Sequence, residues 1–281
     1  MSKPASYPPL TLPDGRHIAL GDSPLIMGIV NVTPDSFSDG GLFAEANAAI
    51  AQGERLAAEG AAIVDVGGES TRPGHSRLDA GHELARIMPV IGPLAGRIAA
   101  PISVDTYKAE VADAALKAGA QIVNDVWACR RDPAIAGVAA RAGAPMVLMH
   151  NRDTIDASLD MLDEVRRFLE ASAALAMAAG VARTQIVIDP GIGFGKTPEQ
   201  NLTLIRRLDR LVELGFPVLL GASRKSTLGL VTGRKIAAER VAASVAAHLY
   251  GALQGAAIIR VHDVPPHVDA LKVWSAIGAA P

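Results

Sequence analysis

The stretch Leu25-Ile-Met-Gly-Ile-Val-Asn31 shows the pattern that decides the fold, a short continuous apolar run that ends at a polar residue. Continuous rather than alternating apolar residues are typical of parallel strands that are covered on both faces. Similar apolar runs recur along the chain, at Ile63–Val66, Ile102–Val104, Ile122–Val123, Met146–Met149, Ile186–Ile188, Val218–Leu220 and Ile258–Val261. With Leu25–Val30 as the first, the sequence predicts eight parallel strands.

Helical patterns lie between these runs, and each is long enough for a crossover helix: Ala44–Glu59, Lys108–Ala118, Pro133–Ala142, Leu159–Ala179, Pro198–Leu214 and Ala237–Leu253. Several are followed by a glycine typical of helix C-termini, namely Gly60, Gly119, Gly143, Gly180 and Gly215. Alternating strands and helices form either an open doubly wound sheet or a closed barrel. Eight near-regular units, with no Gly-x-Gly-x-x-Gly motif after the first strand, favour a (β/α)8 TIM barrel in the α/β class.

The chain has 281 residues. A barrel needs about 250 residues, although length alone equally permits two domains of about 140. No low-complexity linker divides the chain, so we expect a single domain over residues 1–281. The segment Thr11–Gly21 contains the turn-forming residues Pro13-Asp14-Gly15, which predict a short N-terminal hairpin. We expect this hairpin to close the lower mouth of the barrel.

Composition excludes several classes of protein. Apolar residues make up 49% of the chain, and a net charge of -2 without a basic block gives no support for a nucleic-acid partner. The single cysteine, Cys129, cannot form an internal disulfide, and we expect a packed or surface residue rather than a nucleophile. Met1–Leu10 does not resemble a signal peptide, and no segment has the roughly 18 uninterrupted apolar residues of a membrane helix. We therefore expect a cytoplasmic protein with no membrane contact.

Polar side chains that could bind or catalyse follow almost every predicted strand: Asn31, Asp65, Asp105, Asn124, Asp125, His150, Asp189, Ser223–Lys225, Arg260 and His262. Any one of them could cap the next helix. In a barrel, however, all strand ends share one rim, where such enzymes place their active sites. Acidic and amide groups follow the first six strands, and cationic groups follow the last two. This division predicts a ligand with a hydrogen-bonding ring at one end and an anion at the other.

Two long polar loops follow the first two strands, at Asn31–Gly41 and Gly67–Gly74. Both are rich in Gly, Ser, Thr and Asp and can present backbone N–H groups to a ligand. Long loops inside a compact domain are more often lids or binding loops than plain surface turns. We therefore expect both loops at the site.

The segments Met27-Gly-Ile-Val-Asn-Val-Thr-Pro-Asp-Ser-Phe-Ser-Asp-Gly-Gly41 and Asp65-Val-Gly-Gly-Glu-Ser-Thr-Arg-Pro-Gly74 resemble the two signature sequences of dihydropteroate synthases. Further similar segments follow in the same order, at Ser103–Thr106, Asn124–Asp125, Leu148–His150, Asp189–Lys196, Ser223–Ser226 and Arg260–Val264. The resemblance extends from about Leu25 to Val264 and implies a (β/α)8 barrel that is usually a homodimer.

The resemblance implies a transferase of folate (tetrahydrofolate) biosynthesis. Such an enzyme condenses (7,8-dihydropterin-6-yl)methyl diphosphate with 4-aminobenzoate to give 7,8-dihydropteroate and diphosphate. It further implies that Mg²⁺ accompanies the diphosphate and that sulfonamides compete for the 4-aminobenzoate site. The expected partners are therefore these small-molecule substrates and a second copy of the chain.

The resemblance also implies roles for single residues. The pterin-binding residues would be Asp105, Asn124, Asp189 and Lys225, the diphosphate-binding residues Asn31, Thr71, Arg72, Arg260 and His262, and the metal-binding residue Asn31. The 4-aminobenzoate pocket would be formed by Phe37, Thr71, Pro73, Phe194, Lys225 and Ser226. The chemistry agrees, because the Asp189 carboxylate can accept both adjacent donors of a pterin edge, and the Asn124 amide offers both hydrogen-bonding polarities.

The implied mechanism is a dissociative substitution, in which the C–O bond at the pterin methylene breaks before the amine attacks. The catalytic residues would be Asp105, Lys225 and Arg260, with Asp105 offering negative charge near the pterin cation. No dedicated base is expected, because the unprotonated amine already holds its lone pair. Two alternatives stay open, a methyltetrahydrofolate methyltransferase-like enzyme, which would have no diphosphate to bind, and a catalytically silent pterin-binding protein.

Overall fold

Eight strands, β3 to β10, form one parallel sheet rolled into a barrel. The computed structural model describes residues 7–32, 39–69 and 77–280. The strands are β3 (Leu25–Asn31), β4 (Ile63–Gly67), β5 (Ile102–Asp105), β6 (Ile122–Asp125), β7 (Met146–Met149), β8 (Ile186–Asp189), β9 (Leu219–Leu220) and β10 (Ile258–Val261). They are ordered β8-β7-β6-β5-β4-β3-β10-β9, and a parallel bridge between Ile188 and Val218 joins the two outermost strands. The predicted barrel and its eight strands are confirmed.

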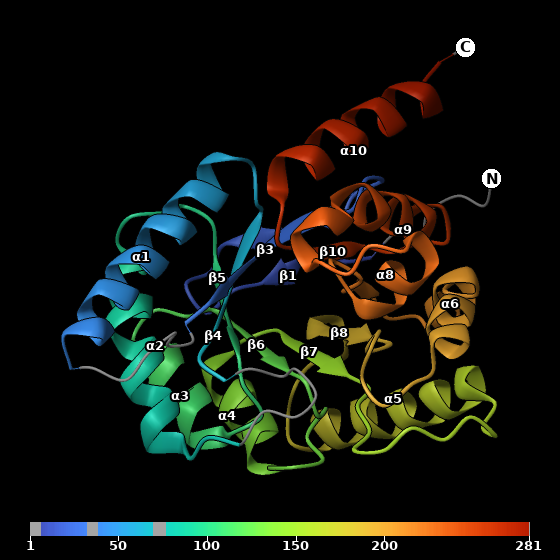
Figure 1. The fold of residues 1–281 in the computed structure, drawn as a ribbon. Coiled ribbons are helices and arrows are strands. Elements are labelled where there is room, and N and C mark those ends of the chain that lie inside the picture. The colour runs from blue at the N-terminus through green and yellow to red at the C-terminus, as the bar shows by residue number, and fades with distance from the viewer. Residues whose placement is uncertain (1–6, 33–38, 70–76, 281) are drawn as a thin grey trace.

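Helices surround the barrel (Figure 1), and the C-terminal part of the last one, α10, projects beyond it. They are α1 (Asp39–Ala58), α2 (Ala80–Ala95), α3 (Ala109–Lys117), α4 (Ala134–Ala142), α5 (Met161–Ala178), α6 (Pro198–Arg206), α7 (Asp209–Val212), α8 (Ser226–Thr232), α9 (Val241–Leu253) and α10 (Val264–Gly278). The five glycines predicted at helix ends all have a positive φ, from 65° at Gly143 to 115° at Gly119. That geometry favours glycine and confirms those helix ends. In the described part of the chain, none of these helices has the length and apolarity needed to cross a bilayer.

Three helices were not predicted, and one prediction was wrong. The proposed single helix Pro198–Leu214 is interrupted at Arg207, where φ is -113° and ψ is 32°, and therefore becomes α6 and α7. The structure adds α2, α8 and α10. Pro89 and Pro93 lie inside α2, and a proline within a helical pattern ordinarily argues against a helix. α8 spans only 7 residues, too few to show a clear helical period in the sequence.

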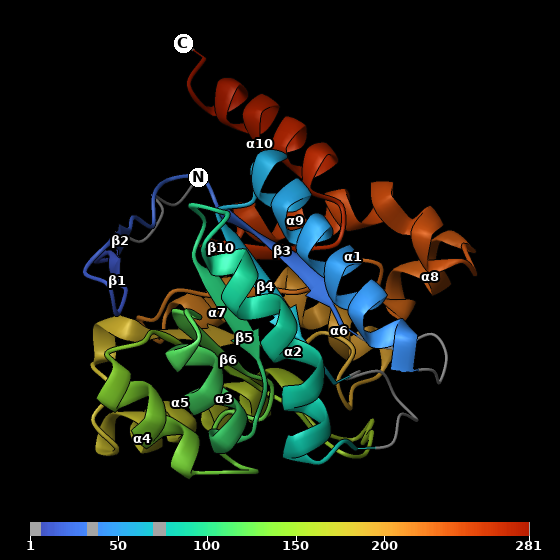
Figure 2. The same ribbon diagram turned by 90° about the vertical axis from the view of Figure 1, so that its left-hand side faces the viewer.

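The N-terminal hairpin closes one end of the barrel, as predicted. β1 (Leu10–Thr11) pairs with β2 (His17–Ile18) in antiparallel register. The buried side chains of Leu10, Leu12 and Leu20 pack against inward-facing residues near the start of the barrel strands. Figure 2 shows the hairpin on the side from which β3 and β4 begin, away from their C-terminal ends.

The two-residue period of the strands divides the barrel interior into an apolar end and a polar end. Ile63, Ile122, Val187 and Ile258 belong to the cluster that packs on the hairpin. Successive side chains of a strand face opposite sides, so the residues two positions later also face inward. Those residues stand at the C-terminal rim and are Asp65, Asn124, Asp189 and Arg260. Each of these four strands thus carries one apolar side chain to the hairpin end and one polar side chain to the rim.

Candidate active site

A partly buried arginine links the ends of three other strands. Arg260 on β10 donates from Nε to Oδ2 of Asp65 at 2.6 Å and from Nη2 to Oδ2 of Asp105 at 2.7 Å. Asn124 on β6 donates from Nδ2 to the same Asp65 oxygen at 3.1 Å. Asp65 is fully buried, while Asp105 and Asn124 are 9% and 3% exposed. The structure therefore brings these four rim residues into one hydrogen-bonded network.

Charge within this network is unbalanced, because one guanidinium faces two carboxylates. Burial raises the pKa of Asp105 to about 7, which outweighs the lowering effect of Arg260. Burial alone would lower the pKa of Arg260, but the carboxylates of Asp65 and Asp105 raise it. The buried Oδ1 atoms of both aspartates have no hydrogen-bond partner among the described residues. Such unsatisfied buried oxygens are the kind of group that a bound ligand can satisfy.

Asp189 brings a third carboxylate to the rim. It is 5% exposed, and its Oδ1 accepts a hydrogen bond from the Gly191 N–H at 2.7 Å. Burial raises the pKa of Asp189 to about 6, although that N–H and the charges of Lys225 and Arg260 lower it. A Cβ built on Gly221 would lie 3.7 Å from Asp189 Oδ2 and 3.9 Å from Arg260 Cβ. Gly221 therefore separates the Asp189 carboxylate from Arg260 without placing a side chain between them.

Lys225 follows β9 and faces the loop after β8. Its Nζ lies 4.0 Å from the ring centroid of Phe194, within cation–π range. A Cβ on Gly193 would lie 3.1 Å from Lys225 Cδ, so the glycine leaves room for the lysine side chain. The charge of Lys225 lowers the pKa values of both Asp105 and Asp189. Lys225 is thus within electrostatic reach of both carboxylates.

His262 lies at the edge of the rim, beside Ser223. The Ser223 Oγ accepts a hydrogen bond from His262 N at 3.1 Å and lies 3.0 Å from Nδ1 of the ring. A serine hydroxyl can accept and donate at the same time, and we infer that this one donates its hydrogen to Nδ1, which leaves the hydrogen of the neutral ring on Nε2. Burial, followed by the charge of Arg260, lowers the pKa of His262 to about 4. A cavity of about 520 Å³ beside it is also lined by Arg55 and Arg224.

Asn31, the last residue of β3, is exposed and pairs in register with Gly67. Its side-chain carbonyl is a hard oxygen donor of the type Mg²⁺ prefers, and Mg²⁺ commonly takes one or two protein oxygens together with substrate phosphates. In the described ranges, no group of three or more His, Cys, Asp or Glu could hold a metal ion. Asn31 therefore fits a metal that a phosphate ligand helps to bind.

Several site predictions remain without a structural account. Four of the residues lie outside the described ranges: Phe37, Thr71, Arg72 and Pro73. Ser226 is described, and it is the exposed first residue of α8, directly after Lys225.

Lys196 is a residue to which sequence reasoning gave no role. It is 4% exposed, and its Nζ donates to the carbonyls of Gly191 (2.8 Å), Phe194 (2.9 Å) and His150 (3.4 Å). Burial lowers the pKa of Lys196 to about 7, but three carbonyl acceptors match the three hydrogens of the charged form. This lysine therefore organises the loop that carries Phe194. The only signal in the sequence was a lysine at the end of a glycine-rich segment.

Two other strand-end residues are structural. The ring of His150 packs edge-on against Phe168 at 4.7 Å between centroids, and burial lowers its pKa to about 2. Neither ring nitrogen has a hydrogen-bond partner among the described residues, and His150 is not part of the network around Arg260. Asp125 accepts hydrogen bonds from the backbone N–H groups of Trp127 (2.8 Å) and Cys129 (2.6 Å). Burial raises the pKa of Cys129 to about 12, as befits a packed thiol rather than a nucleophile.

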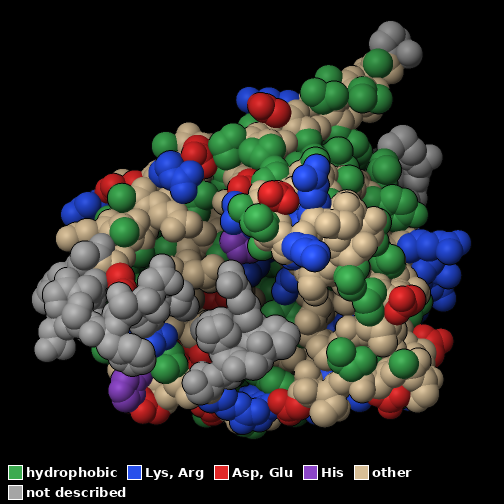
Figure 3. All heavy atoms as spheres, in the orientation of Figure 1, with side chains coloured by type: hydrophobic (Ala, Val, Ile, Leu, Met, Phe, Trp, Pro, Cys, Tyr) green, Lys and Arg blue, Asp and Glu red, His purple; other side chains and the backbone are tan. Residues whose placement is uncertain are grey.

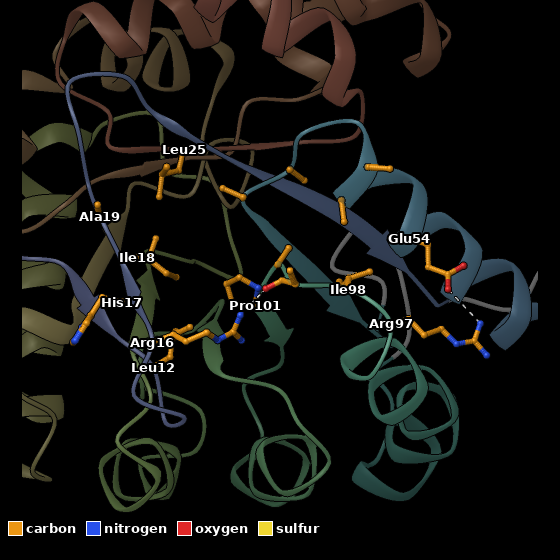
Figure 4. Close-up of a pocket in the computed structure, with 16 residues that line it drawn as sticks. Leu12, Arg16, His17, Ile18, Ala19, Leu25, Glu54, Arg97, Ile98 and Pro101 are labelled. Carbon is orange, nitrogen blue, oxygen red and sulfur yellow. Dashed lines mark hydrogen bonds and ion pairs between the residues drawn. The ribbon is translucent and has the colours of Figure 1, made fainter.

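A larger cavity, of about 840 Å³, lies at the opposite end of the barrel beneath the hairpin (Figure 4). Its charged side chains already have partners. Arg16 pairs with Asp14 and donates to the Ala99 carbonyl, and Arg97 pairs with Glu54. Figure 3 instead shows acidic, basic and histidine side chains around a hollow near the middle of another face. Size alone therefore does not identify the site.

Comparisons with known proteins agree with this geometry. Residues 27–262 match the family model described as pterin binding enzyme. A dihydropteroate synthase from Neisseria meningitidis serogroup B is 47% identical over 268 residues, which are 92% of this chain and 94% of the relative. The Xanthomonas albilineans dihydropteroate synthase with 4-aminobenzoic acid is 49% identical, with a TM-score of 0.92 over 98% of this chain and 100% of that one. A structure of the Xanthomonas protein with 7,8-dihydropteroate matches 98% of this chain and 100% of that one, at 48% identity and a TM-score of 0.88.

Proposed function

The chain belongs to the pterin-binding enzyme family, and from this premise we propose how its rim carries out dihydropteroate synthesis. The reaction condenses (7,8-dihydropterin-6-yl)methyl diphosphate with 4-aminobenzoate and releases diphosphate, a step of folate biosynthesis. One observation carries the assignment of residues to this reaction. Asp105, Asn124 and Arg260 form a single network joined through the buried Asp65, and the charges of Arg260 and Lys225 both act on Asp189.

The pterin ring would lie among Asp105, Asn124, Asp189 and Lys225. Asp189 would accept the ring amide and the exocyclic amine, with Gly191 N–H holding one of its oxygens in place. Asn124 donates from Nδ2 to Asp65, which orients its amide, and its Oδ1 would accept from the ring. The unsatisfied Oδ1 of Asp105 would accept from the ring. A ligand without these donors would leave buried carboxylates unpaired, so we expect the site to select for pterin.

The diphosphate would be held by Asn31, Thr71, Arg72, Arg260 and His262. Arg260 already binds two carboxylates, so we propose that it mainly orients Asp105 and contacts the diphosphate only at the edge of the anion site. His262 is neutral near pH 7, because burial and Arg260 lower its pKa to about 4, and it would donate from Nε2. Asn31 would help to hold Mg²⁺, which when bound neutralises the charge of the leaving diphosphate.

The substitution would proceed in two steps. The C–O bond at the pterin methylene breaks, its electron pair leaves with diphosphate, and the positive charge spreads over the pterin ring. Asp105 titrates close to neutral pH, and the developing cation would favour its ionised form. The lone pair of the 4-aminobenzoate nitrogen then forms the C–N bond, and the extra proton on nitrogen passes to water or diphosphate. No protein base is required for this sequence.

The 4-aminobenzoate pocket would combine Phe194, Lys225 and Ser226 with Phe37, Thr71 and Pro73 from the two polar loops. Lys225 stacks over Phe194, so the two side chains offer a cation beside an apolar ring face. A carboxylate on a benzene ring needs both features. Lys196 would support the pocket by fixing the Phe194 carbonyl.

We further propose that residues 1–281 act as one domain in a homodimer. Large apolar side chains are exposed on or beside α8, α9 and α10: Leu230, Val231, Ile236, Tyr250, Leu253, Val273 and Ile277. Such a surface suits burial against a second copy. Light scattering on the purified chain would give twice the 29.1 kDa monomer mass if the proposal holds, and the monomer mass at micromolar concentration would contradict it.

The activity assay follows diphosphate release. Release is expected only when pterin diphosphate, Mg²⁺ and 4-aminobenzoate are all present, with loss of signal when any one is omitted or when EDTA is added. A preparation that binds the pterin diphosphate, measured by calorimetry, yet releases no diphosphate would overturn the proposal and indicate a silent pterin-binding protein. Asp113→Asn is a suitable control for carboxylate variants, because Asp113 is an exposed partner of Lys117.

A further inference from the structure

Two buried histidines lie behind the rim, between the outer helices and the ends of β9 and β10. His248 on α9 and His267 on α10 are each 1% exposed. Nδ1 of His248 lies 2.9 Å from Nε2 of His267, and the ring planes cross at 61°. Neither side chain reaches the proposed substrates, so the mechanism does not use them directly.

The partners of this pair determine where the ring hydrogens lie. The backbone N–H of Ala222 donates to Nε2 of His248 at 3.2 Å, so in the neutral ring the hydrogen is on Nδ1. Nδ1 of His248 then donates to Nε2 of His267. Nδ1 of His267 is left with the second hydrogen and donates it to the carbonyl of Asp263 at 2.6 Å. Burial lowers the pKa of both rings, which agrees with two neutral histidines.

This chain of hydrogen bonds connects two segments that the sheet leaves unconnected. The ladder between β9 and β10 includes only Leu219 with Ile258 and Leu220 with Ile259. Beyond it, Ala222 precedes the Ser223–Lys225 segment, and Asp263 follows His262. Because the ladder stops short of both segments, their relative position depends on side chains.

The segment after β9 also needs external support. Arg224 has a φ of 58°, a left-handed conformation that is strained for a residue with a Cβ. Its guanidinium pairs with the Asp263 carboxylate, Nε lying 2.9 Å from Oδ2, and its N–H donates to Ser244 Oγ at 2.8 Å. A strained residue of this kind persists only where the surroundings fix it. The histidine pair contacts the same two segments through the hydrogen bonds at the Ala222 N–H and the Asp263 carbonyl.

We propose that His248 and His267 are positioning residues that hold the Ser223–Lys225 segment against the Arg260–Asp263 segment, so that Lys225 and His262 stand at the correct separation for the reaction. This inference rests on the proposed function, because it concerns the placement of Lys225 and His262. The titratable groups that face the pair are His262 on the side of His248 and Asp263 beside His267. A displacement of about 1 Å at such a site costs roughly 100-fold in rate, so the loss of either ring should be visible in kinetics.

The test compares two substitutions at one position. His267→Leu removes both hydrogen bonds, whereas the amide of His267→Gln can accept from His248 and donate to the Asp263 carbonyl. At a temperature where both remain folded, His267→Leu should lower kcat/KM for pterin diphosphate about 10- to 100-fold, and His267→Gln should recover most of it. Leu271→Ala, a cavity variant in the same helix, is the control and should lower Tm with unchanged kcat and KM.

Wild-type kinetics in folded His267→Leu, or equal kinetic losses in His267→Leu and Leu271→Ala, would overturn the proposal. If His267→Leu does not fold, ¹⁵N NMR of the histidine rings in the wild-type enzyme decides: both rings should be neutral with hydrogen on Nδ1, and hydrogen on Nε2 in either ring would overturn the inference. Failure of the proposed function gives a different result, because the wild-type chain would then release no diphosphate at all.

Discussion

Replacing Arg260 with methionine tests whether one positive charge holds the rim network together. The substitution keeps part of the aliphatic side chain but leaves Asp65, which is fully buried, and Asp105, which is 9% exposed, without their guanidinium partner. Removing one partner of a buried ion pair typically costs about 3–5 kcal/mol, because the remaining charge stays desolvated. A domain is stabilised by only about 5–15 kcal/mol in total. Arg260→Met should therefore lose about 3–5 kcal/mol of its unfolding free energy at pH 8.

The loss should depend on pH in a defined direction. The pKa of Asp105 is raised from 3.8 to about 7 by burial, so the folded state binds this proton more tightly than the unfolded state does. Ionisation of Asp105 therefore lowers the free energy of unfolding as pH rises from about 4 to 7. Arg260 lowers that pKa, so its removal raises the pKa further and extends the range over which stability falls. At pH 5 a proton on Asp105 relieves the repulsion, and the deficit should be smaller than at pH 8.

Urea denaturation monitored by circular dichroism at pH 5 and pH 8 measures both effects. Arg97→Met is the matched control, because Arg97 pairs with Glu54 at the surface, where the two side chains are 54% and 41% exposed. An exposed pair of this kind contributes about 0–1 kcal/mol and should show little change between the two pH values. An Arg260→Met deficit no larger than that of Arg97→Met, or equal at both pH values, would refute the charge argument.

Three further predictions concern the proposed roles. Asp105→Ala should lower kcat by about 100-fold, with pterin still bound by calorimetry, and by more than Phe37→Leu does; wild-type turnover in Asp105→Ala would end that assignment. Pterin affinity should fall about tenfold for each pH unit below 6, because burial raises the pKa of Asp189 to about 6 and only the ionised carboxylate accepts both ring donors. A dissociation constant that stays constant from pH 5 to pH 7 would exclude this role. Lys196→Met should reduce stability by about 1–3 kcal/mol and raise KM for 4-aminobenzoate, since three carbonyls lose their donor, whereas Lys117→Met, at an exposed position, should change neither.

The strands and the rim could be predicted from sequence because they follow from a local rule. A run such as Ile186–Ile188 must be covered on both faces, and the polar residue after it, Asp189, must lie at the strand end. Strand periodicity then fixes which face each residue occupies. Ile258 reaches the hairpin cluster and Arg260 reaches the rim because the two positions differ by two residues. No tertiary information was needed for either placement.

The partners of those residues could not be predicted in the same way. Asp65 and Arg260 are 195 residues apart in the chain, and nothing in either segment indicates that one side chain neutralises the other. His150 satisfied the same strand-end rule as Asp105, yet its ring packs against Phe168 on α5, because the direction of a residue just past a strand depends on the next loop. The burial of Lys196 could not be predicted either, because the three carbonyls that accept from its Nζ come together only in the folded loop.

The charge distribution of the rim bears on how the C–O bond breaks. At the proposed pterin end, the three carboxylates of Asp65, Asp105 and Asp189 outnumber the two cations Arg260 and Lys225, and burial raises the pKa values of Asp105 and Asp189 in spite of those cations. A cavity with that excess stabilises a cation on the ring more than it stabilises the neutral substrate. The proposed anion end is at His262, which follows Arg260 by two residues and lies beside Ser223. The excess of carboxylates at the proposed ring site and the hydrogen-bond donors proposed for the diphosphate would therefore both favour separation of charge as the C–O bond breaks. Fixed groups oriented in this way favour the transition state over the ground state, which is the condition for catalysis.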